Sequence, residues 1–162
     1  MAVYTKINKK DISYINKKFD IEKILEFKGI KQGIENTNYL LRSKSKKFIL
    51  TIFEKRVSKK EIPFFMKLMD ELNISEINCP KPQKKKDGGY LLNLKSKTAC
   101  IVSFLEGKDK KILNLQNCYD VGKMIAKMHL STKKINLTRK NSMGIRYLNP
   151  LLKSIRFKSK KF

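Results

Sequence analysis

The sequence predicts an α+β fold in which an antiparallel sheet carries a packed helix and then continues into helical structure. Two observations support this class. Short segments with alternating apolar and polar residues recur between residues 24 and 104, which is typical of half-buried strands. Longer segments at 58–73 and 115–131 repeat apolar residues at helical spacing. A sheet of this kind buries one face against its helix. The length of 162 residues suits one domain or part of a larger protein.

The first elements are a short helix and a strand. Asp11 is positioned to cap a helix, whose apolar face would consist of Ile12, Ile15 and Phe19. Residues 25–30 then alternate, with Leu25 and Phe27 on one side and polar residues on the other. This alternation predicts a half-buried strand.

Two more strands and a helix follow. We expect strands near 38–43 and within "KFILTIFEK", where one apolar face is formed by Phe48, Leu50 and Ile52. Ser58, followed three residues later by Glu61, predicts a capping box at the start of a helix near 58–73. Pro63 is compatible with a first helical turn. The apolar stripe of this helix would contain Ile62, Phe65, Met66, Met69 and Leu72.

The remaining elements reach the end of the chain. "NCPKP" indicates an extended segment, and Asp87-Gly88-Gly89 is typical of a hairpin with strands at 90–94 and 98–104. A long helix is expected at 115–131. Its inward residues would be Val121, Met124, Ile125 and Met128. The tail from about residue 132 carries few helical signals.

The net charge of +24 raises the possibility of nucleic-acid binding. Lysines outnumber arginines 33 to 5, whereas base readout and bidentate phosphate contacts favour arginine. The lysine runs at 44–47 and 84–86 fall in predicted turns, and no basic stretch is interleaved with aromatic residues. These features favour a solvated lysine-rich surface over a nucleic-acid-binding surface, so we expect no nucleic-acid partner.

The chain carries no apolar run long enough to span a membrane, and its start, "MAVYTKINKK", is charged instead of apolar. Cys79, Cys100 and Cys118 lack the CxxC spacing of a metal site. They are typical of reduced thiols. We therefore expect a cytoplasmic protein with no membrane partner.

The loop within "KGIKQGIENTNYLLRS" lies between the first two predicted strands. Gly33 is followed by the polar run Glu35-Asn36-Thr37-Asn38. Glycine lets backbone amides approach an anion, and asparagine side chains donate hydrogen bonds, so this loop could cover phosphates. An ordinary hairpin loop, in which Gly33 supplies a positive φ, fits the same residues.

Several segments in order resemble the homoserine kinase family within the aminoglycoside phosphotransferase and choline kinase superfamily. They include "FKGIKQGIENTNYLLRS", "FILTIFEKRV", "PFFMKLM", "CPKP", "ACIVSFLEGK" and "MIAKMHL". The resemblance runs from residue 1 to about 144. It implies a protein-kinase-like small lobe at 1–104, with about five antiparallel strands and a helix, followed at 105–162 by a hinge and the start of a helical large lobe.

The resemblance also implies roles for particular residues. The loop would cover the phosphates of ATP, and the segment 103–107 would be a hinge whose backbone meets the adenine edge. The implied nucleotide-binding residues are Gly33, Glu35, Asn36, Thr37, Asn38, Thr51, Ser103, Phe104 and Leu105. His129 would be a packing residue at a helix end, not a base.

The sequence departs from the kinase pattern at the phosphates. Kinases place a lysine on the third strand to hold them. Thr51 occupies that position here, although Lys55 and Arg56 follow shortly after. The glutamate expected on the helix is also missing, since Phe65 falls near its place and Glu61 lies one turn earlier.

No acidic residue follows Asp120, although kinases use a later Asp, an Asn and a second Asp for the acceptor hydroxyl and Mg²⁺. We therefore expect no catalytic residue and no metal ligand in this chain, which resembles the first half of a homoserine kinase and would be inactive alone. The implied parent reaction transfers the ATP γ-phosphoryl group to L-homoserine, in threonine biosynthesis. The alternatives are a choline-type or aminoglycoside-type kinase, or a basic nucleic-acid-binding module.

Overall fold

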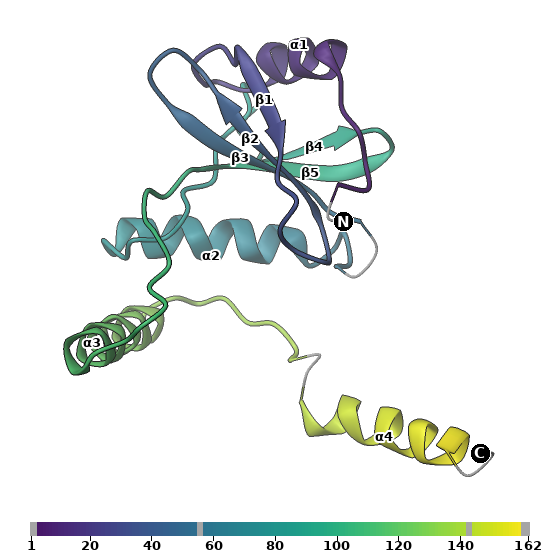
Figure 1. The fold of residues 1–162 in the computed structure, drawn as a ribbon, viewed down its shortest axis with the longest axis vertical. Coiled ribbons are helices and arrows are strands. Elements are labelled where there is room, and N and C mark those ends of the chain that lie inside the picture. Colours follow the sequence, from purple (N-terminus) through teal and green to yellow (C-terminus); the bar gives the residue numbers. More distant parts are fainter. Residues whose placement is uncertain (1–2, 55–56, 142–143, 160–162) are drawn as a thin grey trace.

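A five-stranded antiparallel sheet forms the centre of the computed structural model, which describes residues 3–54, 57–141 and 144–159 (Figure 1). Its strand order is β1-β2-β3-β5-β4. The strands are β1 (Glu26–Gly29), β2 (Thr37–Arg42), β3 (Lys47–Ile52), β4 (Leu91–Leu94) and β5 (Lys97–Ser103). The predicted α+β class and five-stranded antiparallel sheet are confirmed.

The sheet lies between two helices, with α1 (Lys9–Lys18) on one face and α2 (Ile62–Ile74) on the other (Figure 1). The larger core lies on the α1 side. The residues that fill it from α1 and the central strands include Ile12, Ile15, Phe19, Tyr39, Leu41, Phe48, Leu50, Ile52, Ala99 and Ile101. A smaller core under α2 centres on Ile62, Met66 and Cys100.

Alternation along β3 places Phe48, Leu50 and Ile52 in the α1-side core, as the sequence predicted. The strand pairs with β2 through Tyr39 opposite Leu50 and with β5 through Leu50 opposite Ile101. Because side chains alternate between faces of a strand, the intervening residues face α2. That face therefore carries the half-buried positions of the sheet.

The α1 helix begins one turn earlier than predicted. Its N-cap is Asn8, whose Oδ1 accepts hydrogen bonds from the Lys10 and Asp11 amides at 2.9 and 3.2 Å. Asp11 completes a capping box by accepting from the Asn8 amide at 2.8 Å, so its predicted role as the cap itself was wrong. Leu25 was also misplaced, since it precedes β1 and is 62% exposed.

The capping box predicted for Ser58 and Glu61 is absent, and α2 begins at Ile62. Glu61 is the N-cap residue with helical backbone angles, and its amide donates to the Ser58 carbonyl at 2.9 Å in a preceding turn. Pro63 lacks an amide hydrogen, which suits a helix starting immediately before it. The predicted stripe is correct in position, with Ile62, Met66 and Leu72 buried.

The hairpin between β4 and β5 turns at Lys95 and Ser96, which have φ values of 52° and 62°. The sequence predicted the turn at Asp87-Gly88-Gly89. That segment instead forms a separate tight turn before β4, closed by the Lys85 amide donating to the Gly89 carbonyl at 2.7 Å. Residues 81–83 are extended along β5, as "NCPKP" predicted, with Pro82 opposite Val102.

Two helices follow the sheet: α3 (Leu115–Thr132) and α4 (Ile145–Ser159). No α3 residue is buried, so the inward placement predicted for Val121, Met124 and Ile125 was wrong for the described chain; Met128 is half-buried. His129 is likewise exposed instead of packed. No described helix has the length and apolar character needed to cross a membrane.

The α4 helix itself was not predicted. Its apolar residues lie at spacings of three and four, which indicates a helix, but Pro150 interrupts the pattern. These residues are Ile145, Leu148, Leu151, Leu152 and Ile155.

Candidate functional site

The loop between β1 and β2 projects from the sheet and is exposed from residue 31 to residue 35. Gly33 has φ of 101°, and a Cβ added there would meet no atom within 4 Å. Glycine is therefore required for backbone conformation and not for space. The loop is closed at its base by the Ile30 amide, which donates to the Asn38 carbonyl at 2.9 Å.

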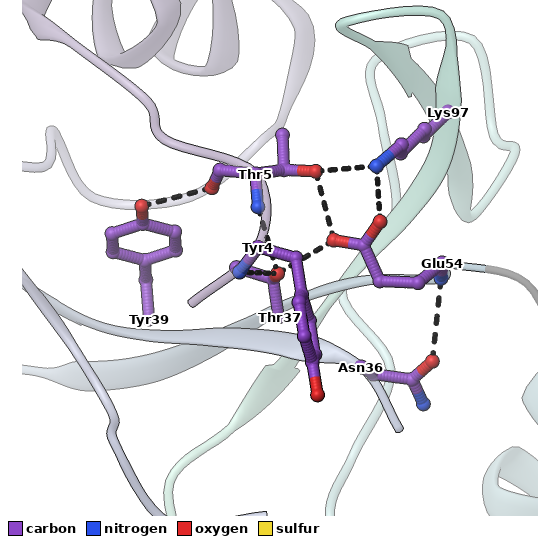
Figure 2. Close-up of polar contacts among 7 residues, drawn as sticks. All are labelled: Tyr4, Thr5, Asn36, Thr37, Tyr39, Glu54 and Lys97. Atoms are coloured by element: carbon purple, nitrogen blue, oxygen red, sulfur yellow. Dashed lines mark hydrogen bonds and ion pairs between the residues drawn. The ribbon is translucent and has the colours of Figure 1, made fainter. Parts of the chain in front are cut away.

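A buried polar network holds the end of the loop, with Glu54 at its centre (Figure 2). The Thr37 hydroxyl donates to Glu54 Oε1 at 2.6 Å, and the Thr5 hydroxyl donates to the same oxygen at 2.8 Å. Lys97 Nζ forms an ion pair with Glu54 Oε2. The Glu54 amide donates to Asn36 Oδ1 at 3.4 Å. Asn36, at the end of the loop, and Thr37, at the start of β2, are thus both hydrogen-bonded to Glu54.

Glu54 remains ionised within this network. Its side chain is 8% exposed, and this burial opposes ionisation. Together, the hydrogen bonds from Lys97, Thr37 and Thr5 outweigh the effect of burial. The pKa of Glu54 is therefore held below its ordinary value. The sequence offers one signal for this group, a carboxylate two residues after an apolar strand, but it does not reveal the partners of Glu54.

Thr51 and Asn38 lie side by side on the α2 face of the sheet. They are register partners, and the Thr51 hydroxyl donates to Asn38 Oδ1 at 2.8 Å. Cys100 is opposite Thr51 on β5 and belongs to the α2-side core. The predicted pair thus lies together on one face, whereas the Thr37 side chain points to the opposite side and is fully buried.

Three half-buried apolar residues form a surface on the same α2 face. Leu40 on β2 is opposite Ile49 on β3, which is opposite Val102 on β5. A hollow of about 380 Å³ adjoins this surface. It is lined by Lys28, Gly29, Ile30, Lys31, Gln32 and Leu40. An apolar surface beside a basic hollow suits a ligand with an aromatic ring and an anionic group. We call Leu40, Ile49 and Val102 the apolar platform.

The segment after Val102 provides backbone groups at the edge of the apolar platform. The Ser103 amide donates to the Lys81 carbonyl at 2.8 Å, and the Phe104 amide donates to the Lys47 carbonyl at 3.2 Å. Among the described residues, none accepts a hydrogen bond from the Leu105 amide. Leu105 therefore has a backbone donor available, whereas the amides of Ser103 and Phe104 are already used.

An ion pair connects the segment after α3 to the start of α2. Arg139 Nε donates to Glu61 Oε1 at 3.0 Å, and the Arg139 guanidinium lies 5.0 Å from the centre of the Phe65 ring. Glu61, which lies one turn before the position of the expected helix glutamate, thus pairs with an arginine from beyond α3. Lys55 and Arg56 lie outside the described residues.

The described residues contain no group of three or more His, Cys, Asp or Glu side chains that could hold a metal ion.

A twisted five-stranded sheet with a helix on the face of the apolar platform, leading through an exposed connector into helices, defines the small lobe of a kinase-like protein. The chain belongs to the phosphotransferase enzyme family, whose family model matches residues 26–153.

Curated relatives extend the comparison. The chain is 40% identical over 146 residues to the homoserine kinase of Rhodopseudomonas palustris, covering 90% of this chain and 45% of that protein. It is 40% identical over 156 residues to the homoserine kinase of Paramagnetospirillum magneticum, covering 96% of this chain and 48% of that protein. The chain therefore spans about half the length of these relatives.

Two solved structures share the fold. A spectinomycin phosphotransferase in complex with ADP and spectinomycin matches with a TM-score of 0.63 at 15% identity, over 78% of this chain and 39% of that chain. A microcompartment-associated aminopropanol kinase matches with a TM-score of 0.64 at 14% identity, over 83% of this chain and 44% of that chain. Both confirm the kinase-like fold.

Proposed function

We propose that this chain is the nucleotide-binding lobe of a homoserine kinase, which transfers the γ-phosphoryl group of ATP to L-homoserine. The 40% identity to named homoserine kinases over 90% of the chain is the observation that carries the proposal. On this proposal, residues 1–104 form the small lobe and residues 105–162 the hinge and the beginning of the large lobe. A cytoplasmic location and a role in threonine biosynthesis follow from it.

The proposed ATP site uses the α2 face of the sheet. The adenine ring would lie on the apolar platform, with its edge accepting a hydrogen bond from the Leu105 amide. The neighbouring hinge residues Ser103 and Phe104 would contribute by shape, because their own amides are used within the chain.

The phosphates would lie beneath the loop that contains Gly33. The amides of Glu35 and Asn36 are candidates to meet them there, since Glu35 ends the exposed part of the loop and Asn36 follows it. Asn38 and Thr51 would contact the nucleotide from the sheet through side chains that already pair at 2.8 Å. Thr37 would act indirectly, by holding the end of the loop through its buried hydroxyl.

This chain alone should not phosphorylate homoserine. Phosphoryl transfer requires a carboxylate near the acceptor hydroxyl and ligands for Mg²⁺ between the phosphates. No acidic residue follows Asp120, and removing such groups typically costs several orders of magnitude in rate. Purified chain incubated with ATP, Mg²⁺ and homoserine should yield no O-phosphohomoserine. Turnover that co-purifies with the chain would contradict this assignment of roles.

Calorimetric titration of the chain with ATP tests the nucleotide site. We expect saturable binding with a stoichiometry of one. The net charge of +24 supports the second candidate, a basic nucleic-acid-binding module. Its signature would be duplex binding that weakens steeply with salt and shows little sequence preference, together with no saturable ATP binding.

A further inference from the structure

The N-terminal segment Val3–Thr5 contacts both arms of the loop that contains Gly33. On the incoming arm, a Cβ at Gly29 would lie 3.0 Å from Val3 Cγ2, so Val3 packs directly against the end of β1. On the outgoing arm, the Tyr4 and Thr5 amides both donate to Thr37 Oγ1, at 2.9 and 3.1 Å. The loop therefore rests on a segment about thirty residues away in sequence.

Tyr4 also reaches the tip of the loop. Its hydroxyl donates to the Ile34 carbonyl at 3.0 Å, next to Gly33. Tyr4 is 56% exposed, so its ring contributes little to the core. Figure 2 shows the Tyr4 side chain extending away from the Glu54 network, on which its own amide is anchored through Thr37.

The base of this arrangement is buried, whereas its tip is exposed. Thr37 is fully buried and Thr5 is 8% exposed, and both hydroxyls donate to the Glu54 carboxylate. Lys97 completes the network by donating to Thr5 Oγ1 at 2.7 Å. Tyr4 thus connects the buried base of the loop, through its amide, to the exposed tip, through its hydroxyl.

We propose that Tyr4 is a positioning residue for the nucleotide phosphates. This inference rests on the proposed ATP site. Its hydroxyl restricts the tip through the Ile34 carbonyl, so that the backbone amides after Gly33 already face the phosphates before ATP binds. A preformed loop loses less conformational entropy on binding, and this raises affinity without any contact between Tyr4 and the ligand.

The test compares Tyr4→Phe with Tyr14→Phe in the 162-residue chain. Tyr14 is an exposed tyrosine on α1, on the other side of the sheet from the proposed nucleotide site, so its variant controls for the loss of a surface hydroxyl. Titrations with ATP and with adenosine separate phosphate positioning from adenine binding. Loss of one neutral hydrogen bond predicts that Tyr4→Phe weakens ATP binding about three- to tenfold. Adenosine affinity should stay unchanged, and Tyr14→Phe should match the unsubstituted chain for both ligands.

A second measurement reports on the loop without ligand. Hydrogen exchange of the amides at 34–36 should be faster in Tyr4→Phe and unchanged in Tyr14→Phe. Equal losses of ATP and adenosine affinity, or unaltered ATP affinity and exchange in Tyr4→Phe, would overturn the inference. If the unsubstituted chain binds neither ATP nor adenosine, the proposed function itself fails and the inference fails with it.

Discussion

The Glu54 carboxylate accepts a hydrogen bond from the buried Thr37 hydroxyl at 2.6 Å, joining the end of β3 to the first residue of β2. These residues are 17 positions apart in sequence. The contact determines where the loop before Thr37 leaves the sheet. It therefore links the stability of the small lobe to the geometry of its proposed phosphate site.

Glu54→Gln should destabilise the fold. The amide retains the shape of the side chain but loses the charge that Lys97 and the two hydroxyls stabilise. Because hydrogen bonds to charged groups contribute about 1–3 kcal/mol, and Lys97 is partly exposed, we expect a loss within that range. Urea unfolding measures it. Glu26→Gln, on an exposed position of β1, is the matched control and should change the free energy of unfolding little.

The same carboxylate predicts a pH dependence. The pKa of Glu54 in the folded chain lies below its ordinary value of 4.5, so ionised Glu54 stabilises the fold above that pH. This contribution is lost as the pH falls through the folded pKa. The difference in unfolding free energy between the unsubstituted chain and Glu54→Gln should therefore narrow below about pH 4.5. Parallel stability curves down to pH 3 would contradict the assignment.

Gly33→Val should weaken ATP binding by straining the loop. The φ of 101° is unfavourable for a β-branched residue, although the site is spatially open. Gly122→Ala on α3 provides a contrast, because that glycine lies in a helix and has no positive φ. In a full-length relative, the change equivalent to Gly33→Val should raise the KM for ATP more than that for homoserine. Equal effects on both would indicate a purely structural turn.

The three cysteines should react at different rates. Burial raises the pKa of the Cys100 thiol from 9.0 to about 12, which lowers its thiolate fraction at pH 8 on the order of a thousandfold. Burial also raises the pKa of Cys79, whereas Cys118 is exposed on α3. Iodoacetamide followed by mass spectrometry should label Cys118 first and Cys100 only after unfolding. Early labelling of Cys100 would show that the α2-side core is open.

The Arg139–Glu61 ion pair should hold the segment after α3 against α2. Both side chains are about one-third exposed, so Arg139→Met should change the unfolding free energy by less than about 1 kcal/mol. Its effect should be local. Cleavage by a lysine-specific protease after Lys133, Lys134 and Lys140 should be faster than in the control Arg146→Met. Equal cleavage rates would show that the contact does not order this segment.

The sequence patterns predicted the parts of the fold that depend on local periodicity. Alternation at Phe48, Leu50 and Ile52 predicted β3 and its buried face, because side-chain direction follows from strand geometry alone. The caps were less predictable. Asn8 and Asp11 have similar capping tendencies, and only the structure shows which one begins α1.

The network around Glu54 could not be predicted in this way. Lys97 and Thr5 are 92 positions apart, and their contact depends on the strand order of the complete sheet. The exposure of α3 was equally hidden, because an apolar stripe does not reveal whether its packing partner is present. The contact of Arg139 with Phe65 was also not predictable from local patterns, because it joins segments on either side of α3.

A titration of the isotope-labelled chain with ATP, followed by NMR of its backbone amides, is the most direct test of the proposed nucleotide site. We expect saturable chemical-shift changes at Leu105, at the apolar platform and at residues 33–38. Adenosine should reproduce the changes at Leu105 and at the apolar platform, but not those at residues 33–38. These shifts should persist at 300 mM salt. Shifts confined to the lysine runs at 44–47 and 84–86, and abolished by salt, would show attraction by charge alone. That result would contradict the assignment of this chain as a nucleotide-binding lobe.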